Sequence, residues 1–131
     1  MSLEKAIHER WGTDFLLSAA LPVERLSTGA ARGDTTLPYA ILTRRESRVL
    51  GRTSSGTETT RSFVRLSVWS ADLDQAKNIA QLINHRFDRV EFPLVAGRVL
   101  NMQREQNAQE QADDGSWRLD LDYVVITDGG M

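Results

Sequence analysis

The chain has 131 residues, of which 40% are hydrophobic and 26% charged, with a formal net charge of −2. These values are typical of one small globular domain and give no overall attraction for nucleic acid. There is no cysteine, which excludes disulfides and thiolate metal sites. No apolar run approaches the roughly 18 residues of a membrane span, and the N-terminus lacks the apolar segment of a signal peptide. We therefore expect no membrane partner.

Residues 2–20 are predicted to form the first helix. Its apolar face would be made by residues that recur every four positions: Leu3, Ile7, Trp11 and Phe15. Gly12 and Thr13 weaken the middle of this segment, so a kink or an early break is an alternative.

A β-hairpin is predicted next, with strands at Tyr39–Val49 and Arg61–Trp69 and a Ser/Thr/Gly-rich tip at 51–60. The strand period of 2 divides the second strand into two faces. One face carries Val64, Leu66 and Val68, and the other carries Phe63, Arg65 and Trp69. If helices cover the aliphatic face, the other has the aromatic and arginine content of a protein interface. A sheet twisted enough to bury both sets is the alternative.

The hydrophobic period changes from 2 to about 3.6 at Ser70, which predicts a helix that ends near Phe87. Asp72, followed by Gln75, resembles a capping box at the start of this helix. Asp72 and Asp74 could instead form a functional carboxylate pair, but capping is the preferred interpretation.

The last third predicts two more strands, with an Asp-Asp-Gly turn at 113–115 between them. The first begins at Gly97–Met102, and a short edge segment around Phe92 precedes it. The second, from Trp117 to Val125, alternates apolar and polar residues. Asp120 and Asp122 share its polar face. Metal binding would need further oxygen ligands, so a solvated strand face is preferred.

The predicted order is α-β-β-α-β-β in a single domain over residues 1–131. Hairpin-connected strands imply a mainly antiparallel sheet of four to five strands with two helices on one face, an α+β two-layer sandwich. The two histidines, His8 and His85, lack an evident nucleophile or orienting partner. We therefore predict no enzyme, no catalytic residues, no cofactor and no metal site.

Charge is unevenly distributed along the chain. Six arginines lie between Arg44 and Arg65, whereas acidic residues dominate from Gln103 onward, so we expect one end of the fold to be basic and another acidic. The arginines could contact DNA phosphates or a neighbouring subunit's acids. The alternative is a solvated face with weak surface ion pairs. The predicted oligomer or channel surface comprises Arg44, Arg45, Arg48, Arg52, Arg61, Phe63, Arg65 and Trp69.

Several segments carry a family resemblance through their order and spacing: LPYAIL (37–42), the polar tip, RLSVWS (65–70), QAKNIAQLINHRF (75–87), GRVLNMQREQ (97–106) and DGSWRLDLDYVVIT (114–127). Over roughly residues 3–127 the chain resembles the phage tail-completion, or tail-terminator-like, family of head–tail joining and minor tail proteins. The NMQREQNAQEQADD run is longer and richer in glutamine than the family pattern.

The resemblance implies a structural protein of a phage or prophage virion. Such proteins resemble subunits of a ring, often hexameric, at the head–tail junction or tail end. The implied partners are further copies of the chain, the head connector and tail-tube proteins, with non-specific DNA in the channel. The implied location is the virion, or the host cytoplasm during assembly. The alternative is a small α+β partner- or ligand-binding module without catalysis.

Overall fold

The structure is a computed structural model that describes residues 2–30, 36–52, 54, 56–94 and 97–130. In chain order its elements are α1 (Ser2–Gly12), α2 (Phe15–Ala20), a 3-10 turn η1 (Val23–Arg25), β1 (Leu26–Thr28), β2 (Tyr39–Arg52), β3 (Thr57–Ser70), α3 (Leu73–Phe87), β4 (Val90–Leu94), β5 (Gly97–Gln111) and β6 (Trp117–Gly130). No helix in the described ranges is long and apolar enough to cross a membrane.

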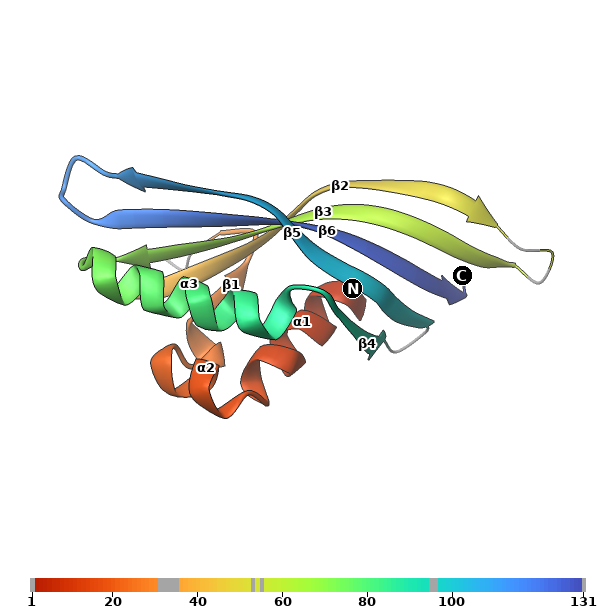
Figure 1. Ribbon diagram of the computed structural model, residues 1–131, viewed down its shortest axis with the longest axis horizontal. Coiled ribbons are helices and arrows are strands. Elements are labelled where there is room, and N and C mark those ends of the chain that lie inside the picture. Colours follow the sequence, from red (N-terminus) through yellow and green to blue (C-terminus); the bar gives the residue numbers. More distant parts are fainter. Residues whose placement is uncertain (1, 31–35, 53, 55, 95–96, 131) are drawn as a thin grey trace.

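The six strands of the described residues belong to one sheet, in the order β1-β2-β3-β6-β5-β4. β1 pairs with β2 in parallel, and every other neighbouring pair is antiparallel. The four long strands accumulate the right-handed twist of β-structure, so the sheet curls into a half-barrel. The helices lie on one side of it, while the β2–β3 hairpin continues well past them (Figure 1).

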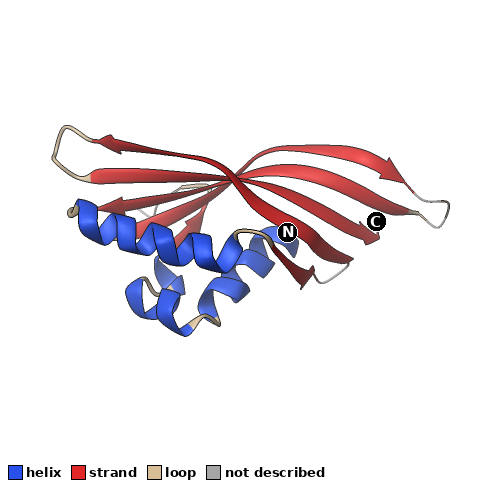
Figure 2. Cartoon of the chain, in the orientation of Figure 1, coloured by secondary structure: helices blue, strands red, loops and turns tan. Residues whose placement is uncertain are grey.

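The predicted two-layer sandwich of four to five strands with two helices is wrong. The residues that the structure describes form six strands of one sheet and three short α-helices, and 54% of these residues are strand, so the sheet dominates the fold (Figure 2). β1 has three residues, too few for a recognisable period. The polar run that follows Met102 is part of a strand, because β6 supplies its ladder partners.

The predicted first helix is two helices, with a break after Gly12. Asp14 adopts an extended conformation and caps α2, because its Oδ1 accepts a hydrogen bond from the Leu17 amide at 2.8 Å. The break rotates the second segment, so Leu17 is buried while Phe15 is 84% exposed. The prediction that Phe15 lies on the core face is therefore wrong.

This cap gives a first testable prediction. Asp14→Ala should lower the free energy of unfolding by about 1 kcal/mol, because the first turn of α2 loses its side-chain acceptor. Asp14→Asn is the matched control: it keeps an acceptor oxygen and removes the charge that lies 3.7 Å from Arg86. Urea denaturation of both variants measures the difference. Equal losses would assign the effect to the charge rather than to the cap.

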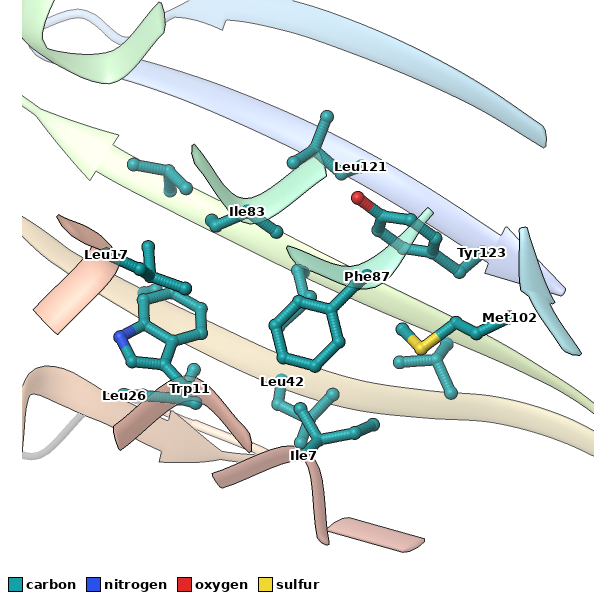
Figure 3. Packing of buried hydrophobic residues seen from close by; sticks show 14 of the residues in the cluster. Ile7, Trp11, Leu17, Leu26, Leu42, Ile83, Phe87, Met102, Leu121 and Tyr123 are labelled. Atoms are coloured by element: carbon teal, nitrogen blue, oxygen red, sulfur yellow. The ribbon is translucent and has the colours of Figure 1, made fainter. Parts of the chain in front are cut away.

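The hydrophobic core lies between the helices and the sheet face that they cover (Figure 3). Trp11 of α1 is fully buried, with its indole centroid 6.5 Å from that of Phe87, and its Nε1 donates to the Leu21 carbonyl at 2.8 Å. From the sheet, the predicted aliphatic set Val64, Leu66 and Val68 faces this core. This packing fixes which face of the sheet remains uncovered.

Candidate functional site

The sheet face opposite the helices, here called the open face, is lined by side chains of the central strands. It consists of Tyr39, Ile41 and Thr43 of β2, Arg61, Phe63, Arg65, Ser67 and Trp69 of β3, and Arg118, Asp120, Asp122, Val124 and Ile126 of β6. The aromatic and aliphatic members are only half-buried. The face therefore combines apolar area with a band of charge.

Aromatic stacking occupies one end of the open face. The rings of Tyr39 and Trp69 stack with centroids 6.0 Å apart, and the Arg118 guanidinium lies 5.4 Å from the Trp69 centroid. These three side chains sit on paired positions of adjacent strands, Tyr39 opposite Trp69 and Trp69 opposite Arg118. The register of the sheet thus assembles a rigid aromatic platform.

A charge cluster occupies the centre of the open face. Arg65 donates two hydrogen bonds to Asp122, from Nε at 2.7 Å and from a terminal nitrogen at 3.1 Å, and it lies 3.8 Å from Asp120. The buried Asp120 also accepts from the Ser67 hydroxyl at 2.7 Å. The hydrogen bond from Arg65 is the main reason that the pKa of Asp122 lies below its usual value.

Three arginines of the predicted surface are ion-paired within the chain. Besides Arg65, Arg44 points to the helix side of the sheet and contacts Glu4 of α1 at 2.6 Å. Arg52, near the end of β2, contacts Glu58 of β3 at 2.5 Å. These three side chains have partners that hold the fold together, so they are not free for an external ligand.

The other three arginines have no ion pair within the described residues. Arg45 occupies a bulge in β2 and lines hollows on the open face together with Arg65 and Phe63. Arg48 is exposed and lies directly opposite Arg61 in the β2–β3 ladder. The Arg61 guanidinium lies over the Phe63 ring at 5.4 Å, with its Nε buried and without a partner in the described chain. Two like charges on facing positions are locally unfavourable.

The basic and acidic segments are only partly separated in the structure. β3, which carries Arg61 and Arg65, pairs along its whole length with the acidic strand β6, so the two charge types meet inside the sheet. On the open face, Arg65 of β3 contacts Asp122 of β6 and Arg118 of β6 contacts Glu110 of β5, at 2.7 Å each. The arginines that outnumber nearby carboxylates lie on β2.

The two predicted acid pairs have structural roles. The Asp72 side chain caps α3 by accepting from the Asp74 amide at 3.3 Å. Gln75 does not bond to the cap residue itself but accepts from Ser70, whose hydroxyl in turn accepts from the Asp72 amide. Asp120 and Asp122 hold Arg65, as described above. Within the described ranges, no group of three or more His, Asp or Glu side chains is arranged to hold a metal ion.

Sequence reasoning missed Tyr39, Arg118 and the acidic partners of Arg65. The alternation in β6 does place Arg118, Asp120 and Asp122 on one face. Which strand lies beside β6 is not a local property, however, because β3 and β6 are separated by a helix and two strands. Only the strand order brings the aromatic and charged sets together.

A groove on the other side of the sheet separates α3 from the β5–β6 hairpin. Its walls carry Lys77 and Asn84 of α3 and Arg104 of β5, above an apolar floor that includes Leu121. The Tyr123 hydroxyl lies 3.2 Å from the Asn84 Oδ1, and burial raises the pKa of this tyrosine.

The structure is thus a small domain built on one sheet, with one broad face that the helices leave uncovered. The sequence profile of the tail completion protein gp17 family matches residues 5–128, so the chain belongs to this family of phage tail proteins. The chain also shares its fold with a chain from the virion of a native gene transfer agent (GTA) particle, with a TM-score of 0.76 and 15% sequence identity, covering 98% of this chain and 96% of that one. No curated protein sequence matches it significantly.

Proposed function

We propose that this chain forms a ring of identical subunits, with a hexamer as the expected stoichiometry, at the head–tail junction or the tail end. Family membership makes it a structural component of the phage tail, located in the virion. The proposed role in the ring is to complete tail assembly. The observation that supports a ring best is the open face, which no element of the described chain covers although it carries half-buried aromatic side chains.

The unpaired arginines support contact with a second protein surface. Arg48 and Arg61 face each other on β2 and β3 without a carboxylate partner in the described residues. An acidic group from a neighbouring subunit would relieve this repulsion. Head-to-tail contacts between identical subunits join two different surfaces and close into a ring when the rotation allows it.

The proposed assembly surface comprises Arg45, Arg48, Arg61, Phe63 and Trp69. We propose that the role is structural rather than catalytic, in line with the family description. Other phage structural proteins are the partners, namely the head connector and the tail tube. Arg45 and Arg48 could also meet DNA phosphates in the channel, without sequence preference.

Salt should weaken the assembly. We expect ring-shaped particles by negative-stain microscopy at about 50 mM salt, and a falling assembled fraction by sedimentation velocity toward about 500 mM, where exposed charges are screened. The double variant Arg48→Gln/Arg61→Gln should lose most of this salt dependence. Arg52→Gln is the matched control, because that arginine is paired within the chain. A chain that remains monomeric at every salt and protein concentration would contradict the proposed ring.

A further inference from the structure

The short outer strands β1 and β4 leave long parts of β2 and β5 without an outer strand partner among the described residues. β1 pairs with β2 only at Ala40–Leu42, so from Thr43 to Arg52 the outer edge of β2 has no strand partner among the described residues. β4 pairs with β5 only up to Met102, and the Arg104 amide donates to the Asp88 carboxylate at 2.8 Å. From Glu105 to Gln111 the outer edge of β5 is therefore also without a strand partner in the described chain.

We propose that these two edges are the junction between copies, with the free edge of β2 in one subunit pairing with the free edge of β5 in the next. This inference rests on the proposed ring and adds to the open face a backbone contact between copies along the sheet edges. Unpaired backbone groups along an edge strand are a ready template for another strand. About six residues of β5 would pair, over a length of about 20 Å.

Charge favours pairing of unlike edges. The β2 edge carries four arginines and one glutamate, of which Arg45 and Arg48 have no ion pair within the described residues. The β5 edge carries no basic residue and two glutamates, of which Glu105 has no ion pair within the described residues and Glu110 pairs with Arg118. Pairing β2 with a second β2 would juxtapose arginines, and pairing β5 with a second β5 would juxtapose glutamates. Contact of β2 with β5 brings opposite charges together.

Irregularities in both strands restrict how the edges can meet. Extra residues interrupt the ladder of β2 at Arg45 and Leu50, which leaves Glu46–Val49 as a regular stretch between bulges. In β5 a bulge at Glu105 precedes the regular stretch Gln106–Gln111. Bulges and edge charges block indiscriminate strand addition, and they leave one short, defined segment on each side for a specific partner.

Strand direction and position fit a closed assembly. Three successive antiparallel pairings make β2 and β5 run in opposite directions, so a copy added in the same orientation continues the sheet with an antiparallel pair. The free part of β2 lies near the β2–β3 tip and that of β5 near the β5–β6 turn, at opposite ends of the sheet (Figure 1). Pairing them requires a stagger along the strands, as in closed barrels.

The absence of cysteine allows a direct test. Arg48→Cys, carrying an affinity tag, is mixed under oxidising conditions with untagged Gln106→Cys, Ala108→Cys or Glu110→Cys. All four positions are exposed, and by register they lie on the same side of the sheet. At least one mixture should give a disulfide-linked dimer of one tagged and one untagged chain. Asn78→Cys, at an exposed position of α3, is the control and should cross-link with none of them.

The outcomes separate the two proposals. Rings by microscopy together with the mixed dimer support the edge junction. Rings accompanied only by like-with-like dimers, or by no dimer, overturn the edge junction and leave the proposed ring standing. A chain that neither forms rings nor cross-links contradicts the proposed ring and the edge junction with it.

Discussion

Replacement of Trp11 by alanine should lower the free energy of unfolding by about 3–5 kcal/mol, the usual cost of removing a large buried aromatic side chain. Trp11 is fully buried, packs against Phe87 and donates a hydrogen bond to the Leu21 carbonyl. The substitution leaves a cavity where α1, α3 and the end of α2 meet. Guanidinium or urea denaturation, followed by far-UV circular dichroism, measures the loss.

Phe15→Ala is the matched control for this prediction. Phe15 is four residues after Trp11 and belongs to the same apolar repeat in the sequence, yet it is 84% exposed. Its truncation should change the free energy of unfolding by no more than about 0.5 kcal/mol. Comparable losses for the two variants would mean that α1 and α2 form one continuous helix, contrary to the break after Gly12.

Acidification should remove a stabilising contribution centred on Asp122. The hydrogen bond from Arg65 is the main cause that lowers the pKa of Asp122 in the folded chain. The stabilising contribution is therefore fully present above the unfolded pKa of about 3.9, and it is lost as the pH falls through the folded pKa. The stability difference between the wild type and Asp122→Asn should therefore be largest near neutral pH and shrink below about pH 4. Urea midpoints measured across this range test the sign.

Arg65→Met should lower the free energy of unfolding by about 2 kcal/mol at neutral pH, because it removes charge-assisted hydrogen bonds and leaves Asp120 and Asp122 with fewer partners. Arg52→Met is the comparison. The Arg52 side chain is 67% exposed and its pair with Glu58 lies near the hairpin end, so the loss should stay below about 1 kcal/mol. A larger loss for Arg52→Met than for Arg65→Met would contradict the central role of the charge cluster.

Local patterns predicted most of the elements but not their arrangement. The change of period at Ser70 correctly marked the end of β3 and the start of α3, because both periodicities are local. The alternation along β3 indicated two chemically different faces, and the structure places the aliphatic one on the core. By contrast, the polar strand segment that ends at Gln111 has no apolar face, and only its ladder with β6 makes it a strand.

Only the part of the candidate surface that depends on local alternation could be predicted from the sequence. Phe63, Arg65 and Trp69 follow from alternation within one strand, whereas their contacts with Asp122 and Arg118 depend on strand order across the sheet. The charge separation expected from the sequence holds only for β2 and β5, because β3 and β6, which are far apart in the chain, became neighbours. Sequence could identify the arginines but not which of them are already paired.

The uncovered edge of β2 also has a mechanical consequence. Each residue of β3 from Thr57 to Ser70 has a ladder partner in β6, and most have one in β2 as well. Among the described residues, β2 beyond Leu42 has a strand partner on one side only. Local opening of the backbone costs less free energy in a strand that is hydrogen-bonded to one neighbour than in a strand that is bonded to two. In the proposed ring a neighbour supplies the second ladder, so the stiffness of this part of the subunit would be a property of the assembled particle and not of the isolated chain.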